Sequence, residues 1–188
     1  MKFITKYNLD VSKLNLGNYI GSGVDGEVYE LGDKVIKLVL IKDEKKKALA
    51  AFNKNRILIN NLIDSKQNHF VNVFDFKVLT QGADNNYYII YSYIMERLEK
   101  LSEDEYKVIK TLISHDDFNI KKDLSNSRIH KILNEFDGYF TFNKNKIIDF
   151  VNSINKSNII QTDMHIRNVM KDKFNNYKFI DLERLEYK

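Results

Sequence analysis

Three side chains near the carboxyl end of the chain have the types and spacing of a metal-dependent reaction centre. Asp163 and Asn168 lie five residues apart, and Asp181 follows thirteen residues after Asn168. Residues 169–180 indicate two short strands joined by a turn at residues 175–176, which would return Asp181 to the side of Asn168. Amide and carboxylate oxygens are ligands that suit Mg²⁺. The spacing therefore predicts a cation site, with Asp163 placed to accept a proton from a hydroxyl group.

The composition of the chain limits the class of protein. With 188 residues, 43% hydrophobic and 30% charged, it can form one ordinary domain or two small lobes that share a cleft. It has no cysteine, which excludes a disulfide framework and a thiolate metal site, and no apolar run of signal-peptide or membrane-span length. The net charge of +4 is spread along the chain, which favours a solvated surface over a nucleic-acid footprint. We therefore expect a soluble, cytoplasmic protein that binds neither a membrane nor nucleic acid.

Three glycines near the amino end are spaced as in a phosphate-binding loop. Gly21, Gly23 and Gly26 form a GxGxxG pattern in the segment YIGSGVDGEVYEL. Glycine there lets backbone N–H groups approach a phosphate that a Cβ atom would hold off. The same pattern marks dinucleotide-binding turns, but those lead from a strand into a helix. Here both flanks indicate strands and residues 32–33 a hairpin turn, so we expect the loop to lie between antiparallel strands.

A lysine in the next strand is placed to meet the same phosphate groups. In the segment KVIKLV, alternation puts Lys37 on one face with Val35 and Val39. Ile36 and Leu38 lie on the other face. A lysine between two valines is unusual for a solvated face. We interpret it as a cation held beneath the glycine loop, with an exposed lysine on an edge strand as the alternative.

The four motifs together resemble those of the protein kinase superfamily, in the same order and with similar spacing. They are the glycine loop GSGVDGEVY, the lysine in VIKL, the D-x-x-x-x-N loop and the later IDLE, within residues 18–97 and 147–184. The resemblance implies an α+β, bilobal fold. Its N-lobe, residues 1–97, would be an antiparallel β-sheet with one helix. Its reduced, mainly helical C-lobe, residues 98–188, would contain the catalytic loop and the metal-binding hairpin.

The resemblance also implies ATP as the nucleotide and Mg²⁺, with Mn²⁺ as an alternative, as the metal. Asp163 corresponds to the catalytic base, and Lys37 to the residue that contacts the α- and β-phosphates. Asn168 and Asp181 correspond to the metal ligands, and Asn168 joins Asp163 and Lys37 in the catalytic set. Apolar side chains would cover both faces of adenine, and the linker between the lobes would bind its edge. The implied nucleotide-contacting positions are Ile20, Gly21, Gly23, Gly26, Val28, Val35, Lys37, Glu96, Leu98, Met170 and Ile180.

The helix expected after the lysine strand lacks the usual partner of that lysine. Residues 43–64 indicate a helix with an apolar stripe and Asp43 as its cap. The kinase pattern has a glutamate in the middle of this helix, whereas this chain has asparagines and an arginine there. Its only glutamate, Glu44, is at the start. We favour Glu44 as the partner of Lys37, with Asp181 or an asparagine as alternatives.

The catalytic segment departs from the protein-kinase pattern toward that of small-molecule kinases. Asp163, His165 and Asn168 form a D-x-H-x-x-N loop similar to that of aminoglycoside, choline and sugar kinases. His165 is expected to support the loop, with proton transfer as the alternative role. Glu183 is a candidate ligand of a second cation, with a surface ion pair as the alternative.

The rest of the expected C-lobe is helical. Three segments, residues 102–115, 125–136 and 143–155, have amphipathic patterns whose apolar positions would form a core. Ser102 and Glu105 have the spacing of a capping box. We therefore expect a helix to begin there.

The resemblance implies an ATP- and Mg²⁺-dependent transfer of the γ-phosphate to a hydroxyl group. The chain ends at Lys188, seven residues after Asp181, so we expect a minimal, atypical kinase with a truncated C-lobe. The glycine loop favours Ser or Thr of a protein as acceptor, and the D-x-H-x-x-N loop favours a small molecule; we lean toward protein. The alternative is a catalytically inactive pseudokinase that binds a nucleotide or a partner protein.

Overall fold

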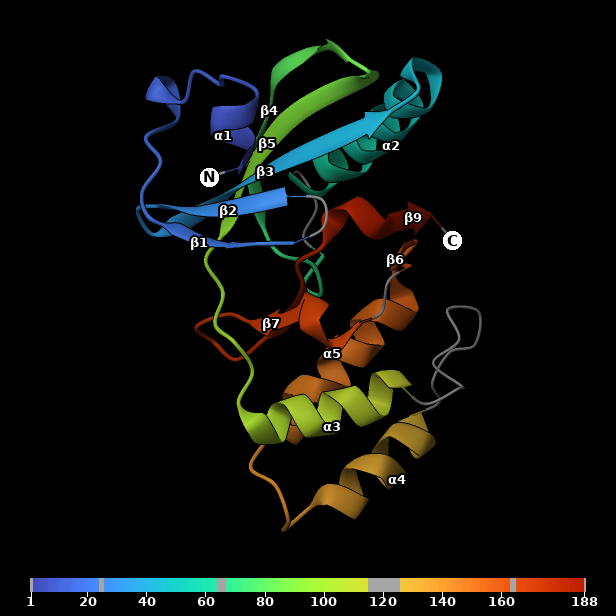
Figure 1. Cartoon of the computed structure of the whole chain (residues 1–188). Helices are drawn as coiled ribbons and strands as arrows, with labels where there is room; N and C mark the ends of the chain where they lie inside the picture. The colour runs from blue at the N-terminus through green and yellow to red at the C-terminus, as the bar shows by residue number, and fades with distance from the viewer. Residues whose placement is uncertain (1, 24–25, 64–66, 115–125, 163–164, 188) are drawn as a thin grey trace. The chain divides into compact units, whose positions relative to one another are not determined.

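The computed structural model of the chain describes residues 2–23, 26–63, 67–114, 126–162 and 165–187 (Figure 1). It has two compact units. Unit 1 comprises Met1–Ser65 and Asn72–Arg97, and unit 2 comprises Lys66–Val71 and Leu98–Lys188. The sequence analysis divided the chain once, after residue 97. The segment Lys66–Val71 departs from this division, because it belongs to unit 2 although it precedes residue 97.

Unit 1 is built on an antiparallel five-stranded sheet in the order β1-β2-β3-β5-β4. The strands are β1 Tyr19–Ser22, β2 Gly26–Leu31, β3 Lys34–Asp43, β4 Val73–Asp84 and β5 Asn86–Glu96. Gly32, with a φ of +61°, makes the tight turn between β2 and β3. Helix α2 (Lys45–Ile63) follows β3. Helix α1 (Lys2–Lys6) and the short turn η1 (Ser12–Leu14) precede the sheet.

The two faces of this sheet are covered by different elements, as the alternation in β3 predicts. Ile36 and Leu38 belong to a buried cluster that packs against side chains of α1 and η1. Lys37 lies on the opposite face, where α2 packs (Figure 1). On that face the ring centroids of Phe52 in α2 and Tyr91 in β5 lie 5.7 Å apart. The predicted division of β3 between two faces is therefore confirmed.

In the described part of unit 2, three helices accompany two antiparallel pairs of short strands. The helices are α3 Glu103–Ser114, α4 Asn126–Phe136 and α5 Lys144–Lys156, at the three positions expected from the sequence. Strand β6 (Ile159–Gln161) pairs with β9 (Leu185–Tyr187), and β7 (Val169–Lys171) pairs with β8 (Tyr177–Phe179). Two single-turn helices, η2 (Ile166–Asn168) and η3 (Leu182–Arg184), lie before β7 and β9.

Aromatic rings hold the β7–β8 pair in the core of unit 2. The ring centroid of Phe179 in β8 lies 5.2 Å from that of Phe150 in α5 and 6.1 Å from that of Phe70. The backbone around Phe70 runs alongside β8. The Val71 N–H donates to the Phe179 carbonyl, and the Phe179 N–H to the His69 carbonyl, both at 2.9 Å. These bonds explain why this short segment belongs to unit 2.

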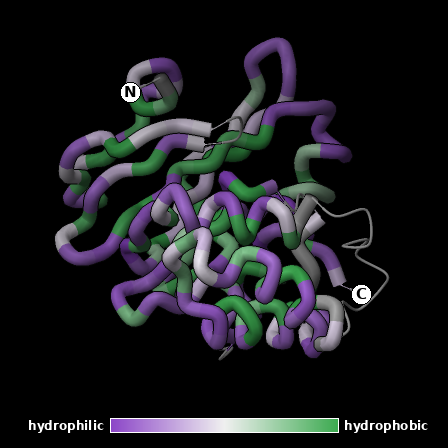
Figure 2. The backbone as a smooth tube through the Cα atoms, turned by 90° about the horizontal axis from the view of Figure 1, so that it is seen from below, coloured by the Kyte–Doolittle hydropathy of each residue, from purple (hydrophilic) through white to green (hydrophobic). Residues whose placement is uncertain are grey.

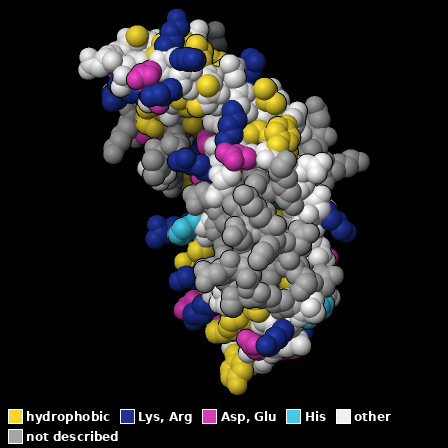
Figure 3. Space-filling model, turned by 90° about the vertical axis from the view of Figure 1, so that its right-hand side faces the viewer, with side chains coloured by type: hydrophobic (Ala, Val, Ile, Leu, Met, Phe, Trp, Pro, Cys, Tyr) yellow, Lys and Arg dark blue, Asp and Glu magenta, His cyan; other side chains and the backbone are white. Residues whose placement is uncertain are grey.

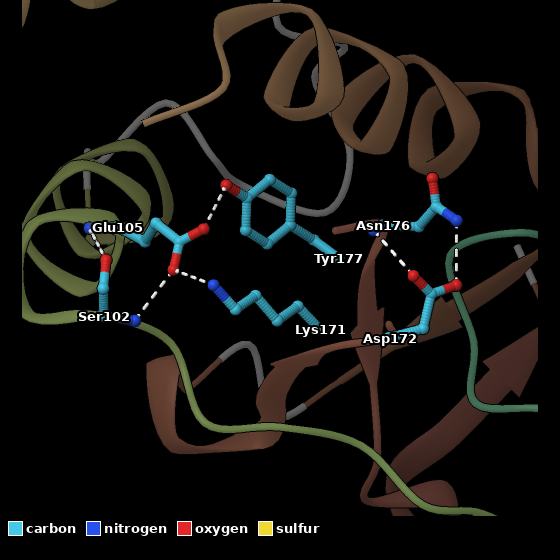
Figure 4. Close-up of polar contacts among 6 residues, drawn as sticks. All are labelled: Ser102, Glu105, Lys171, Asp172, Asn176 and Tyr177. Atoms are coloured by element: carbon cyan, nitrogen blue, oxygen red, sulfur yellow. Dashed lines mark hydrogen bonds and ion pairs between the residues drawn. The ribbon is translucent and has the colours of Figure 1, made fainter. Parts of the chain in front are cut away.

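A capping box begins α3, as the spacing of Ser102 and Glu105 predicts. The Glu105 N–H donates to Ser102 Oγ at 3.2 Å, and the Ser102 N–H donates to Glu105 Oε2 at 2.8 Å. Glu105 is only 6% exposed and also accepts hydrogen bonds from Lys171 Nζ at 2.8 Å and Tyr177 Oη at 3.0 Å (Figure 4). Burial acts to raise the pKa of Glu105, but the bonds from Lys171, Ser102 and Tyr177 outweigh it, and the pKa lies below its ordinary value. This carboxylate ties α3 to the β7–β8 pair.

Within the described ranges, no helix combines the length and apolar character that crossing a bilayer requires. Figure 2 shows hydrophobic positions recurring among hydrophilic ones along the chain. Helices and strands with one buried side require this recurrence.

The close pairing of β2 with β3 depends on glycine at position 26. A Cβ atom there would lie 2.6 Å from the carbonyl oxygen of Leu38. We predict that Gly26→Ala lowers the free energy of unfolding by about 1–3 kcal/mol, because the strands must separate locally. Urea denaturation followed by circular dichroism measures this loss. Gly23→Ala is the matched control, since a Cβ atom there would meet nothing within 4 Å; equal midpoints for the two variants would contradict the prediction.

The depressed pKa of Glu105 predicts a pH dependence of stability. Its folded-state pKa lies below the ordinary value of 4.5, so its stabilisation is present above that value and is lost as the pH falls through the folded-state pKa. We expect the urea midpoint of the wild type to fall more steeply in this acidic range than that of Glu105→Gln. Glu103→Gln is the control, because the Glu103 side chain is 82% exposed. Parallel profiles for wild type and Glu105→Gln would refute the assignment.

Candidate nucleotide and metal site

The β7–β8 hairpin sets Asp181 beside Asn168, as the sequence predicts. Val169 pairs with Phe179 in the ladder. At the next position the Ile180 N–H donates a 2.9 Å hydrogen bond to the Asn168 carbonyl oxygen. Asp181 therefore follows directly on a residue that is bonded to Asn168. Both side chains are half-buried.

Asp172 closes the turn of this hairpin. Its Oδ1 accepts the N–H groups of Phe174 at 2.8 Å and Asn176 at 2.9 Å. Its Oδ2 accepts Asn176 Nδ2 at 2.8 Å, and Figure 4 shows both bonds from Asn176. Asn175 takes a left-handed φ of +59°, which asparagine tolerates. Lys178 Nζ lies 3.7 Å from Asp172 Oδ2. Burial acts to raise the pKa of Asp172, but the bonds from Asn176 and Phe174 and the charge of Lys178 outweigh it, so the pKa is lowered.

The sequence analysis located this turn but missed the residue that organises it. It assigned the turn to Asn175 and Asn176, whereas the carboxylate that holds both ends is Asp172. The signal was present, because an aspartate that bonds backbone N–H groups a few residues later is a common turn former.

Asp163, the predicted catalytic base, lies outside the described residues, but the strand that leads to it is tethered. Thr162 donates from both its N–H and its Oγ1 to the Arg184 carbonyl oxygen, at 2.7 and 2.8 Å. The pairing of β6 with β9 continues this tether. The sequence analysis did not predict β9. A three-residue strand gives too little alternation to be recognised.

His165 supports the loop that ends at Asn168, as expected. Its Nδ1 accepts the Arg167 N–H at 3.1 Å, and its carbonyl accepts the Asn168 N–H at 2.8 Å. Because Nδ1 is an acceptor, the neutral ring has its proton on Nε2. His165 thus caps the single turn η2 that ends at Asn168.

The predicted metal ligands are Asn168, Asp181 and Glu183. Glu183 lies half-buried in η3, two residues after Asp181. Among the described residues, no three His, Asp or Glu side chains cluster as a metal site. The predicted set has two acids and one amide, so its role as a metal site stays a prediction.

The three glycines of the predicted phosphate loop lie between antiparallel strands, as the sequence analysis expected. Gly21 is in β1, Gly23 follows it, and Gly26 begins β2. The loop tip, residues 24–25, lies outside the described residues. The Gly23 N–H donates to the Gly26 carbonyl at 2.9 Å, so this N–H is used within the loop. Cβ atoms at Gly21 and Gly23 would meet nothing within 4 Å.

Lys37 is a buried residue of an interior strand. It is 9% exposed and lies between its ladder partners Val28 in β2 and Tyr93 in β5. The alternative interpretation, an exposed lysine on an edge strand, is therefore wrong. Lys37 Nζ lies 5.9 Å from the centroid of the Tyr93 ring.

Glu44 is not the partner of Lys37, contrary to the sequence analysis. Strand β3 runs to Asp43, so Glu44 lies beyond its end, about 20 Å along the strand from Lys37. The Glu44 side chain is 72% exposed and pairs with Lys47 at 3.3 Å. The error arose because the expected helix was given Asp43 as its cap, whereas β3 extends through that residue.

Two of the three apolar positions predicted to cover adenine in unit 1 share the face of Lys37. Val28 is the ladder partner of Lys37, and Val35 lies two residues before it in β3. Residues at these positions point to the same side of a sheet. Ile20 lies at an irregularity of the β1–β2 register and is 50% exposed.

The remaining predicted contacts are in the β7–β8 hairpin and after β5. Met170 in β7 and Ile180 after β8 share one face of the hairpin, because their ladder positions are two apart. Glu96 ends β5; its N–H donates to the Asn72 carbonyl at 3.0 Å and its Oε1 accepts the Asn72 N–H at 2.7 Å. Leu98 lies two residues further along the chain. The nucleotide contacts of these residues stay predictions.

The hairpin that presents Asn168 and Asp181 depends on Asp172. We predict that Asp172→Ala lowers the free energy of unfolding by about 2–4 kcal/mol, because three hydrogen bonds are lost and the buried Lys178 ammonium loses a carboxylate neighbour. Urea denaturation measures the change. Lys173→Ala, at the exposed neighbouring position, is the control. A loss no larger than that of the control would contradict the role of Asp172.

Comparison with known proteins identifies the fold. No family model and no curated protein matches the sequence. Among solved structures, the chain is similar to the ROP18 kinase domain solved in complex with AMP-PNP and sucrose, at 16% sequence identity and a TM-score of 0.53. The match covers 92% of this chain and 52% of that one, so this chain spans about half the length of the solved chain. The chain therefore has the predicted α+β, kinase-like fold, with an antiparallel sheet in unit 1 and mainly helices in unit 2.

Proposed function

We propose that the chain is an ATP- and Mg²⁺-dependent kinase that transfers the γ-phosphate to a hydroxyl group. The main support is the hydrogen bond from the Ile180 N–H to the Asn168 carbonyl, within a kinase-like fold. This bond keeps Asp181 and Asn168 adjacent although twelve residues separate them. Phosphoryl transfer requires mainly positioning and charge neutralisation, which such a pair can provide with a metal.

The side chains at the hairpin fit Mg²⁺. Asn168 has an amide oxygen and Asp181 a carboxylate oxygen, and Mg²⁺ accepts such ligands together with waters and phosphate oxygens. Glu183 is the proposed additional ligand, and Mn²⁺ suits the same donors. When bound, the metal would neutralise charge on the β- and γ-phosphates.

Features of unit 1 support a triphosphate beside the glycine loop. Packing within the chain does not require glycine at positions 21 and 23, whereas close approach of a phosphate does. Lys37 supplies a buried cation on the strand next to the loop. The backbone between Glu96 and Leu98 is the proposed contact of the adenine edge.

The proposed reaction needs one proton acceptor. The acceptor oxygen forms a bond to the γ-phosphorus, the bond from that phosphorus to the β,γ-bridging oxygen breaks, and ADP leaves. The hydroxyl proton passes to the Asp163 carboxylate. Lys37 holds α- and β-phosphate oxygens, and the bonds from Thr162 to the Arg184 carbonyl hold the start of the catalytic loop.

We favour Ser or Thr of a protein as the acceptor, with a small-molecule hydroxyl as the competing choice. The glycine loop between antiparallel strands supports the first, and the D-x-H-x-x-N loop supports the second. The ROP18 kinase domain was solved with AMP-PNP, which supports nucleotide binding by this fold. On the face drawn in Figure 3, Lys and Arg side chains are interspersed with acidic ones, which supports a partner other than nucleic acid. A cytoplasmic location is favoured by the cysteine-free composition.

A pseudokinase is the second candidate. Helix α2 contains no acid, so it cannot supply the carboxylate that active kinases use to orient the lysine. Such a protein would bind nucleotide, or only a protein partner, without transferring phosphate.

Two measurements test the proposal. Binding of ATP with Mg²⁺ should raise the melting temperature, because ligand at 100 times its Kd adds about 2.7 kcal/mol of stability. Asp181→Asn should reduce the Mg²⁺-dependent part of this rise. An unchanged melting temperature at millimolar ATP and Mg²⁺ would reject both nucleotide-binding candidates.

Radiolabelled γ-phosphate then separates the kinase from the pseudokinase. Wild type should transfer label to a protein or a soluble hydroxyl compound in a cell lysate, and Asp163→Ala should lower the rate by at least about a hundredfold. Equal labelling by wild type and Asp163→Ala would reject Asp163 as the base. Nucleotide binding without any transfer would favour the pseudokinase.

A further inference from the structure

The helix that packs over Lys37 offers it no carboxylate. The sequence of α2, KKKALAAFNKNRILINNLI, contains neither Asp nor Glu. Glu44 lies beyond the far end of β3. By contrast, its ladder neighbours in β2 and β5 lie directly beside it.

Tyr93 provides such a contact. It lies directly opposite Lys37 in the β3–β5 ladder, and Lys37 Nζ is 5.9 Å from the centroid of its ring. A cation at this distance is attracted by the negative face of an aromatic ring. Tyr93 is fully buried and Lys37 nearly so, and exclusion of water strengthens the attraction.

Strand β2 restricts Lys37 from the other side. A Cβ atom at Gly26 would lie 3.1 Å from Lys37 Cε, so the lysine stem occupies the space that glycine leaves. The stem of a lysine is flexible and ordinarily samples many rotamers. Confinement between Gly26 and Tyr93 reduces that freedom and fixes the direction of the ammonium.

The strand that presents Tyr93 is in turn fixed by α2. Tyr91 lies two residues earlier on the same face of β5, and its hydroxyl accepts a hydrogen bond from Asn55 Nδ2 at 3.1 Å. Its ring also packs edge-on against Phe52. Asn55 is buried, so this hydrogen bond is shielded from water. Through Tyr91, helix α2 therefore helps to fix the position of β5 and of Tyr93 on that strand.

We propose that Tyr93 is a positioning residue for Lys37, whose ring face orients the ammonium in place of a helix carboxylate. The proposal rests on the proposed nucleotide-binding role of Lys37. Because Lys37 and Tyr93 are ladder partners, the orientation of the lysine depends on the pairing of β3 with β5.

A shape-matched series at position 93 tests the role of the ring. Tyr93→Phe keeps the ring, and a ring-trifluorinated phenylalanine keeps its shape while removing most of the negative charge from its face. We expect Tyr93→Phe to leave the Kd for ATP with Mg²⁺ within about twofold of the wild type. Fluorination should then raise that Kd by about twofold to thirtyfold, the range that corresponds to a cation–π contact. Isothermal titration calorimetry measures both.

The same series in a Lys37→Met background is the decisive comparison. Without the ammonium, fluorination at position 93 should have no further effect on ATP affinity. The same fluorinated residue at Phe76, the ladder partner of Tyr93 in β4, is the matched control and should change nothing in either background. An equal loss of affinity with and without Lys37, or no loss in its presence, would overturn the proposal.

A nucleotide-free cycle separates this proposal from the proposed function. In the apo protein, fluorination at position 93 should lower the urea midpoint when Lys37 is present and leave it unchanged in Lys37→Met. If the effect of fluorination depends on Lys37 in this way but ATP does not bind, the orienting contact is supported and the proposed function is rejected. If ATP binds but the effect of fluorination does not depend on Lys37, only the proposed role of Tyr93 is rejected.

Discussion

The register of the β7–β8 hairpin is the constraint on which the candidate metal site depends. A strand pair that slips by one residue turns every side chain to the opposite face. Here such a slip would break the bond between Ile180 and the Asn168 carbonyl and would expose the buried ring of Phe179. The register is held at the turn by Asp172 and along β8 by Phe179, which also bonds the segment around Phe70. The contacts of Asp172 and Phe179 therefore fix the register that keeps Asn168 and Asp181 adjacent.

Buried carboxylates in this chain have structural roles that differ from those of the predicted site acids. Glu105 and Asp172 each accept several hydrogen bonds and stand near a lysine, and the pKa of each is lowered in spite of burial. Burying a charge is unfavourable unless it is paired and bonded, and bonds to a charged group contribute about 1.5–3 kcal/mol each. In unit 1, Glu27 is also buried, and it accepts a hydrogen bond from the Tyr29 hydroxyl at 2.8 Å. By contrast, the predicted metal ligands Asp181 and Glu183 are half-buried.

The two faces of the sheet in unit 1 have different surroundings. One face is an apolar core, in which Ile36 and Leu38 pack against Tyr29. The other holds Lys37 among aromatic side chains and beneath α2. Strict alternation along β3 allows a buried cation and a dry core to be adjacent in sequence without contact. Glycine at position 26 is needed for the same reason, since β2 must approach both the Leu38 carbonyl and the Lys37 stem.

Four ordered motifs in the sequence, through their resemblance to kinases, predicted the fold class. The sequence by itself also determined the alternation of β3, the capping box at Ser102 and the hairpin between Asn168 and Asp181, and these three features are local. These three local features depend on periodicity and on turn and cap chemistry, which a single segment contains. The tertiary structure decided the partners of distant residues. It placed Glu44 far from Lys37, because the length of β3 depends on its pairing with β5 rather than on its own residues. It also joined β9 to β6, because a strand of three residues is stable only when a distant partner completes its hydrogen bonds.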